Sequence, residues 1–349
     1  MQLAELDVEG WHRVVRVSDQ SSGLNAVISV HDISVGPGCG GCRIFPYADF
    51  ESGLADANRL SQGMTYKNAL AGIPFGGGKA VIYADTRKNK TPEMLLAFGK
   101  AVHALDGLYY TAEDSGMTED DIIAVSSQTP FAAGTAKAGQ GGNPAPYTAR
   151  GVWRGIHAAA RHKFGSDDLR GRKITIVGVG AVGMELARLL HEDGAELTVA
   201  DVHQPYLDEA ASRFGAKIVA PEAAAGISCD IFSPCALGQA INETTINQLD
   251  TAIVAGAANN QLARPEYDQE LLDRGILYAP DYVINAAGVI SVGLEILKTW
   301  SIDEMNTRID AIRTTLGTVF ENASTNNAPT GQVANSMAEA IIKRGTFTA

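Results

Sequence analysis

The spacing of apolar residues alternates between two periods in the first 130 residues of the chain. Short apolar runs bounded by turn residues predict strands at 14–19, 24–32, 79–85 and 109–114. Apolar residues three to four positions apart predict helices at 49–72, 91–105 and 117–128. The helix at 91–105 has Thr91 as its expected N-cap and Pro92 at its first position. We therefore expect a mixed α/β domain here.

From residue 171 the pattern becomes a regular alternation of short apolar runs and amphipathic segments. The runs predict strands at 173–178, 195–201, 216–220, 230–235, 252–258 and 276–280. Several of them are unbroken apolar runs, which is typical of a parallel sheet that is buried on both faces. The chain then ends in predicted helices at 294–300, 303–323 and 332–344.

A loop rich in glycine and proline, residues 132–146, separates these two patterns and is typical of a hinge between domains. A chain of 349 residues is long for one hydrophobic core, which also favours two domains. We expect an α/β fold with a substrate domain at 1–135 and a doubly wound Rossmann domain at 136–327. The C-terminal helix, 328–349, is expected to pack back on the first domain, and the cleft lies between the two.

Charge and composition exclude several classes of function. The formal net charge is −12, which is poorly suited to binding a nucleic acid. No apolar run approaches the ~18–20 residues that span a bilayer, and the N-terminus has no signal-peptide pattern. The chain has four cysteines and no disulfide framework, so a cytoplasmic location is expected.

Two of the cysteines form a C-x-x-C in GPGCGGCR, residues 36–43, which could be a redox dithiol, half of a zinc site or a glycine-rich turn. A structural zinc site usually needs two ligand pairs, and Cys229 and Cys235 lie far away in the sequence. A redox dithiol usually begins a helix, whereas Cys39 and Cys42 follow a predicted strand. The glycine-rich turn is favoured, and no metal is expected.

The segment GVGAVG is a G-x-G-x-x-G motif that lies between a predicted strand and a predicted helix. Its glycines would allow a tight turn, the approach of a pyrophosphate and close helix–strand packing. Asp201 ends the next strand, where its carboxylate would bind the adenosine ribose and repel the extra phosphate of NADP. NAD is the expected cofactor, bound by Gly178, Val179, Gly180, Ala181, Val182, Gly183 and Asp201.

Two lysines flank a second glycine-rich segment, MTYKNALAGIPFGGGK. Lys67 lies near the end of a predicted helix, and Lys79 follows three glycines and opens an apolar strand. Two ammonium groups held together at low dielectric lower each other's pKa. One lysine could then act as a neutral base while the other stays charged and binds an anion.

Eight segments together resemble the Glu/Leu/Phe/Val dehydrogenases, with a pattern most similar to the leucine dehydrogenases within that family. They are MTYKNALAG, PFGGGK, TAEDSGMT, NPAPYTARGV, GVGAVG, PCALG, AGAANNQ and YAPDYVINAAG. The similarity runs from about residue 24 to about residue 345. It implies an enzyme that reversibly deaminates an L-amino acid to a 2-oxo acid and ammonia, with NAD as the hydride carrier, and that forms a homo-oligomer, an octamer.

The resemblance also implies roles for individual residues. Lys67 would bind the substrate carboxylate together with the backbone of Gly40 and Gly41. Lys79 would be the base that activates water for attack on the imine, and Asp114 would carry protons to and from the amino group. Further substrate contacts are implied for Met64 and Asn260, and cofactor contacts for Thr148, Cys235, Ala236 and Asn259.

In this resemblance the pocket for the substrate side chain is formed around Cys39, Ala112, Val289 and Val292. These residues are small or branched, and none of them could pair with a second carboxylate, so glutamate is disfavoured. The pattern implies leucine, valine and isoleucine as substrates. The chain departs from the leucine-type GPALGGTR, however, and the small Cys39 leaves room that could admit methionine or phenylalanine.

Three alternatives stay open at this point. The first is a phenylalanine or tryptophan dehydrogenase of the same family. The second is a non-catalytic regulator that binds NAD or an amino acid on the same scaffold. The third is a different Lys/Asp reductase with a Rossmann domain, similar to shikimate dehydrogenase.

Overall fold

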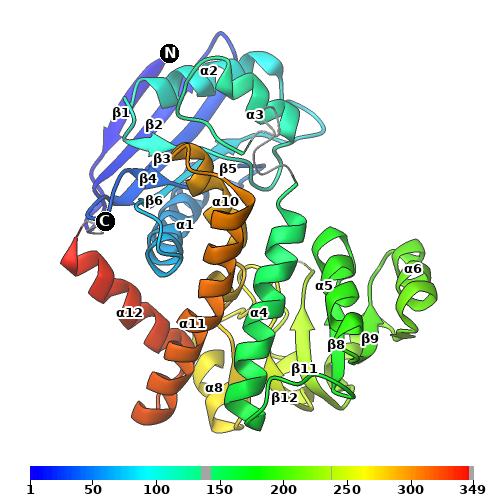
Figure 1. Ribbon diagram of the computed structural model, residues 1–349. Helices are drawn as coiled ribbons and strands as arrows, with labels where there is room; N and C mark the ends of the chain where they lie inside the picture. The colour runs from blue at the N-terminus through cyan, green and yellow to red at the C-terminus, as the bar shows by residue number, and fades with distance from the viewer. Residues whose placement is uncertain (135–142, 237, 346–349) are drawn as a thin grey trace. The chain divides into compact units, whose positions relative to one another are not determined.

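The computed structural model describes residues 1–134, 143–236 and 238–345, and its chain divides into two compact units (Figure 1). Unit 1 comprises Met1–Gly142, Val289–Ile302 and Ala338–Ala349, and unit 2 comprises Asn143–Gly288 and Asp303–Met337. The expected hinge, 132–146, lies largely outside the described residues. The division also differs from the expected boundaries, because 289–302 belongs to unit 1 and the last helix is shared between the units.

Unit 1 is built on a mixed seven-stranded sheet with the order β1-β2-β3-β6-β4-β7, and β5 also pairs with β6. The first four strands in this order run antiparallel, whereas β4 and β5 run parallel to β6. The strands are β1 (Gln2–Leu6), β2 (Arg13–Asp19), β3 (Leu24–Asp32), β4 (Gly38–Cys39), β5 (Cys42–Phe45), β6 (Gly76–Tyr83) and β7 (Tyr109–Tyr110).

Helices cover both faces of this sheet, α2 and α3 on one face and α1 on the other (Figure 1). They are α1 (Phe50–Leu70), α2 (Pro92–His103) and α3 (Glu119–Ser126). Successive strand residues point to opposite faces, so Ala80 and Ile82 pack toward α2 and α3 while Val81 packs against Ala57 of α1. Lys79 has the same parity as Val81, which directs it to the face that α1 covers.

The three glycines before Lys79 belong to the strand that the sequence predicts to begin only at Lys79. Gly76–Gly78 are the first three residues of β6 and are buried. A Cβ at Gly76 would lie 1.9 Å from the carbonyl oxygen of Asp32, and one at Gly77 would lie 2.0 Å from Oγ1 of Thr65. Only glycine fits this close approach of neighbouring backbone, so a strand begins where composition indicates a turn.

Unit 2 contains a parallel six-stranded sheet with the order β10-β9-β8-β11-β12-β13. This is the strand order of a doubly wound dinucleotide-binding fold, and it confirms the expected fold class. The strands are β8 (Lys173–Val177), β9 (Glu196–Ala200), β10 (Lys217–Ile218), β11 (Cys229–Pro234), β12 (Thr251–Val254) and β13 (Leu277–Tyr278). Three of them, β10, β12 and β13, are clearly shorter than the apolar runs predicted.

The remaining helices follow the predicted alternation, with one exception. They are α4 (Ala145–Phe164), α5 (Ala181–Glu192), α6 (Gln204–Phe214), the 3₁₀ helix η2 (Pro221–Gly226), α7 (Thr245–Gln248), α8 (Tyr267–Asp273), α9 (Asp281–Ile284), α10 (Ala287–Ile296), α11 (Ile302–Asn326) and α12 (Thr330–Arg344). The bounds predicted for the helix at 294–300 are wrong, because α10 begins at Ala287 and ends at Ile296. Within the described residues, no helix is long and apolar enough to cross a membrane.

Candidate active site

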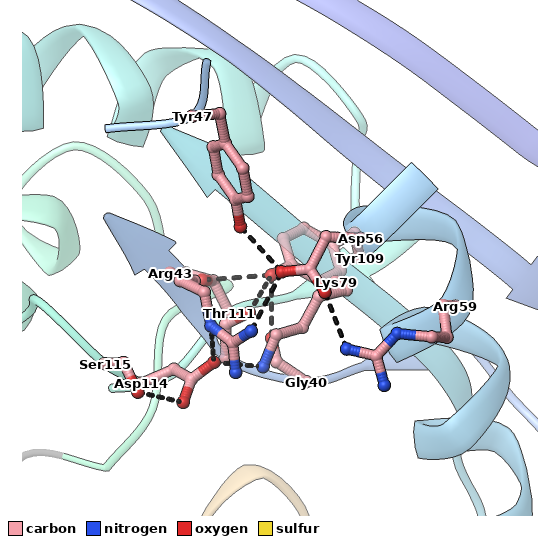
Figure 2. A network of polar contacts seen from close by, with 11 residues as sticks. Gly40, Arg43, Tyr47, Asp56, Arg59, Lys79, Tyr109, Thr111, Asp114 and Ser115 are labelled. Atoms are coloured by element: carbon pink, nitrogen blue, oxygen red, sulfur yellow. Dashed lines mark hydrogen bonds and ion pairs between the residues drawn. The ribbon is translucent and has the colours of Figure 1, made fainter. Parts of the chain in front are cut away.

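A buried ion pair joins two of the residues that the sequence singles out. Nζ of Lys79 lies against Oδ2 of Asp114, and the lysine side chain is only 7% exposed (Figure 2). Burial alone raises the pKa of Asp114, but the charges of Lys79 and Arg43 outweigh it and lower that pKa below its usual value. The carboxylate is therefore ionised near neutral pH.

The glycine turn between β4 and β5 lies directly beside this pair. A Cβ at Gly41 would lie 2.8 Å from Cβ of Asp114. A Cβ at Gly40 would lie 2.9 Å from Cγ of Met64 and 2.0 Å from the carbonyl oxygen of Gly78. The glycine turn thus lies close to Met64, Lys79 and Asp114. Any larger residue at Gly40 or Gly41 would clash with these neighbours.

Two further charged residues extend this network: Arg43 contacts Asp114, and Asp56 contacts Arg43. Nε of Arg43 lies 3.5 Å from the same Asp114 oxygen that Lys79 contacts, and its Nη1 donates to Oδ2 of Asp56 at 2.8 Å. The Tyr47 hydroxyl also donates to that Asp56 oxygen, at 2.7 Å. Figure 2 shows these residues as one network that extends from Lys79 to the exposed Arg59.

Tyr109 supports the glycine turn from below. Its hydroxyl donates to the carbonyl oxygen of Gly40 at 2.7 Å and is fully buried. The backbone of Gly40 is therefore fixed by a side chain from a different strand, β7. A backbone that is held in this way can present its other polar groups to a ligand without further ordering.

The predicted substrate-pocket residues all lie in unit 1. Lys67 is in the last turn of α1 and is partly buried. A Cβ at Gly134 would lie 3.9 Å both from Cβ of Ala112 and from Cγ2 of Val292, so these two side chains face a common space. Val289 precedes Val292 by one turn of α10 and is buried.

Cys39 and Cys42 are free thiols in the core of unit 1. Cys39 is 1% exposed, and burial raises its pKa to about 12. Burial also raises the pKa of Cys42, with the charge of Lys79 opposing the shift. Among the described residues, no group of three or more His, Cys, Asp and Glu side chains is placed to hold a metal ion.

In unit 2 the glycine motif forms the turn between β8 and α5. Gly178 has φ +95°, which favours glycine, and a Cβ at Gly183 would lie 1.9 Å from the carbonyl oxygen of Gly178. Gly180 is the N-cap of α5, has no side-chain cap and has open space where a Cβ would point. Ala181 and Val182 form the first turn of α5 and leave its N–H groups accessible to a phosphate.

Asp201 directly follows β9 and contacts this turn. Its Oδ2 accepts from the backbone N–H of Val179 at 2.7 Å, and its Oδ1 accepts from that of His203 at 2.9 Å. Each carboxylate oxygen keeps a second lone pair for a further donor. The open cradle at Gly180 and the negative charge at Asp201 fit a dinucleotide cofactor.

The remaining predicted cofactor residues follow β11 and β12 or lie at the start of α4. The backbone of Gly178 packs closely against the segment that contains Cys235 and Ala236. A Cβ at Gly178 would lie 2.5 Å from the backbone nitrogen of Ala236. Thr148 lies in the first turn of α4, with Oγ1 3.6 Å from a Cβ placed on Gly288. Asn259 and Asn260 follow β12 and are exposed; Asn260 has φ +50°.

Sequence reasoning missed four residues that the structure brings to these sites. Arg43, Asp56 and Tyr109 hold the Lys79–Asp114 region, and the buried Asn285 donates to Oδ1 of Asn259 at 2.7 Å. For Arg43, its position at the end of GPGCGGCR, two residues after the glycine turn, is the sequence signal that could have found it. Asp56 and Tyr109 belong to other elements and resemble ordinary surface and core residues in the sequence.

Comparisons with known proteins agree on one family of enzymes. The model of the Glu/Leu/Phe/Val dehydrogenase, dimerisation domain, matches residues 11–131, and that of Glutamate/Leucine/Phenylalanine/Valine dehydrogenase matches residues 197–345.

Individual relatives match nearly the whole chain. The chain is 44% identical over 339 residues to leucine dehydrogenase from Geobacillus stearothermophilus, and this match covers 97% of this chain and 92% of the relative. Valine dehydrogenase from Streptomyces virginiae is 40% identical, with 95% and 93% covered. The crystal structure of L-tryptophan dehydrogenase from Nostoc punctiforme has a TM-score of 0.86 at 40% identity and 96% coverage of both chains.

Proposed function

Because the chain belongs to the Glu/Leu/Phe/Val dehydrogenase family, we propose that it catalyses the NAD-dependent reversible oxidative deamination of a branched-chain L-amino acid to its 2-oxo acid and ammonia. The observation that carries this proposal is the buried Lys79–Asp114 pair beside the glycine turn at Gly40 and Gly41. A proton can pass directly between these two side chains, which is what an amine-releasing reaction requires.

The residues divide the chemistry between them. Lys67 and the backbone at Gly40 and Gly41 bind the substrate carboxylate. When bound, the nicotinamide cofactor supplies the acceptor for hydride from the substrate Cα. Lys79 gives a proton to Asp114 and then serves as the base that activates water, while Asp114 carries protons to and from the departing amino group.

The side-chain pocket supports a branched aliphatic substrate. Ala112 and Val292 face a common space, and neither side chain could neutralise a second carboxylate. Leaving a glutamate carboxylate unpaired there would cost several kcal/mol. The aromatic alternative rests on the same apolar lining, on the small Cys39 and on the similarity to a tryptophan dehydrogenase.

NAD is preferred over NADP in this proposal because the Asp201 carboxylate occupies the end of β9, where the extra phosphate of NADP would meet a negative charge. Thr148, Cys235, Ala236, Asn259 and Asn260 contact the cofactor or bridge it to the substrate. The protein acts as a homo-oligomer, since the matching model of residues 11–131 is described as a dimerisation domain. Its four free cysteines fit a reducing cytoplasm.

A substrate panel tests the proposal. Initial rates are measured with leucine, valine, isoleucine, methionine, phenylalanine and tryptophan, each with NAD and with NADP, and the reverse reaction is run with and without ammonia. We expect the branched-chain substrates to lead with NAD and the reverse reaction to require ammonia. If phenylalanine or tryptophan leads by about tenfold in kcat/KM, the aromatic alternative is correct. A reverse reaction without ammonia would indicate another class of reductase.

A further inference from the structure

We propose that Arg43 is a positioning residue for this reaction: its guanidinium fixes the Asp114 carboxylate against Lys79, and Asp56 anchors Arg43 for that purpose. This inference rests on the proposed function, which gives Asp114 and Lys79 their roles. It adds to them Arg43 and Asp56, which in this proposal act through Asp114 rather than on the substrate or the cofactor.

The first support is the geometry around a single oxygen atom. Oδ2 of Asp114 contacts two cations, Nζ of Lys79 and, at 3.5 Å, Nε of Arg43 (Figure 2). The Arg43 separation is that of an ion pair rather than a hydrogen bond. Arg43 comes from β5 and Lys79 from β6, so the carboxylate is held by two adjacent strands of the sheet.

The second support is that Arg43 is itself held. Its Nη1 donates to Oδ2 of Asp56 at 2.8 Å, and the Tyr47 hydroxyl donates to the same oxygen at 2.7 Å. The other oxygen of Asp56 accepts from Arg59 at 2.7 Å. An arginine fixed by a neighbour loses less side-chain entropy when it acts on a third group.

The third support is the order of charges along the network. From Lys79 through Asp114 and Arg43 to Asp56 the signs alternate, and all four side chains are at most 23% exposed. Without Asp56, a partly buried Arg43 would add an uncompensated positive charge close to Lys79. Asp56 therefore allows a second cation to act on Asp114 at little electrostatic cost.

The consequence concerns the pH at which Asp114 can accept a proton. Burial raises the pKa of Asp114, and the charges of Lys79 and then Arg43 lower it by more. The other ionisable neighbours are Glu113, Cys42 and Tyr109, and burial raises the pKa of each of them, so the thiol and the phenol stay neutral. Removing Arg43 should therefore raise the pKa of Asp114, so that activity is lost at a higher pH as the solution is acidified.

The experiment compares pH–rate profiles of the full-length enzyme and four variants: Arg43→Met, Arg43→Lys, Asp56→Asn and Arg59→Met. Arg43→Met should move the acid limb of kcat upward by about one pH unit, which corresponds to a tenfold change in proton affinity. KM for the amino acid should change by less than about threefold, because Arg43 does not touch the substrate. Arg43→Lys keeps a positive charge at this position and should therefore shift the acid limb by less than Arg43→Met does.

Asp56→Asn and Arg59→Met form a matched pair. Asp56→Asn should give a smaller shift in the same direction as Arg43→Met, because an unanchored Arg43 moves away from Asp114. This loss outweighs the removal of the Asp56 charge, since Asp56 does not contact Asp114. Arg59→Met breaks an ion pair with the far oxygen of Asp56, and Arg59 is 57% exposed, so the profile should not move. Thermal unfolding of each variant reports whether the fold is retained.

Two outcomes separate this inference from the proposed function. If Asp114→Asn abolishes turnover while Arg43→Met keeps the wild-type profile, Arg43 does not position Asp114, although the proposed function stands. If Asp114→Asn remains fully active, the proposed role of Asp114 is itself wrong. Should Arg43→Met not fold, Asp56→Asn gives the same readout, and an unmoved acid limb in that variant would overturn the inference.

Discussion

The backbone N–H of Val179 donates to Oδ2 of Asp201 at 2.7 Å, which ties the end of β9 to the glycine turn that follows β8. The sequence predicts both the turn and the aspartate but treats the aspartate only as a ligand for the ribose. Its second oxygen accepts from the N–H of His203, so the same carboxylate also shapes the turn in which it lies. The residue that we propose to select the cofactor therefore also stabilises the glycine turn.

We predict that Asp201→Asn reduces the preference for NAD over NADP by at least about tenfold, mostly by improving kcat/KM with NADP. Asparagine keeps one carbonyl oxygen that can accept the N–H of Val179, but it has no charge to repel a 2′-phosphate. The ratio of kcat/KM for the two cofactors is the measurement. An unchanged ratio would show that a group other than Asp201 selects the cofactor.

Lys79→Met should lower kcat by several orders of magnitude, because methionine has a similar volume and cannot exchange a proton with Asp114. NAD affinity should stay within about threefold of wild type, since Lys79 belongs to unit 1 and the glycine motif to unit 2. Stopped turnover together with normal NAD binding is the expected pattern. Turnover near the wild-type rate would rule out Lys79 as the base.

The two units differ in how much of their fold the sequence predicts. Apart from the exposed edge strand β10, the strands of unit 2 are largely buried and follow one another with helices between them, so each apolar run indicates one strand. In unit 1, Gly76 and Gly77 lie in β6, at positions where neighbouring atoms approach too closely for any side chain. Their composition indicates a loop, and only the packing shows otherwise.

The site shows the same limit. Lys79, Asp114 and the glycine turn could be predicted because each lies in a segment with a characteristic order of residues. Asp56 could not be, because it lies on α1 and meets Arg43 of β5 through tertiary packing that no periodicity encodes. Asn285 is similar, since its amide reaches Asn259 from a different loop.

Val292→Ala should widen the side-chain pocket and favour larger substrates. Its Cγ2 and Cβ of Ala112 face the same space, so losing two methyl groups should raise kcat/KM for phenylalanine relative to valine by about tenfold or more. Ala112→Val is the opposite change and should lower that ratio. If both variants keep the wild-type ratio, these residues do not line the pocket.

Cys39 and Cys42 should resist alkylation in the folded protein. With a pKa of about 12, Cys39 is almost entirely protonated at pH 8, and the thiolate is the reactive form. Iodoacetamide followed by peptide mass analysis should leave both thiols unmodified until denaturant is added, and a zinc chelator should not change activity. Rapid labelling of Cys39 with loss of activity, or inactivation by the chelator, would support the redox or metal interpretation instead.

From the environment of Asp268 we predict that the stability of unit 2 depends on pH. The residue lies on α8, and its Oδ2 accepts from the backbone N–H of Gln332 at 3.2 Å at the start of α12. Its Oδ1 is among the buried atoms of the described residues that have no hydrogen-bond partner. Burial raises the pKa of Asp268 to about 6, although the hydrogen bonds from α12 oppose the shift.

The folded state therefore binds a proton at Asp268 more tightly than the unfolded state does. The stability from this group is fully present below the unfolded pKa and is lost as the pH rises through about 6. Asp268→Asn resembles the protonated form, so its melting temperature should match wild type near pH 4 and exceed it increasingly toward pH 8. The gain corresponds to roughly 3 kcal/mol at most. Asp273→Asn, on the exposed end of the same helix, should show no such trend, and a difference for Asp268→Asn that does not change with pH would contradict the prediction.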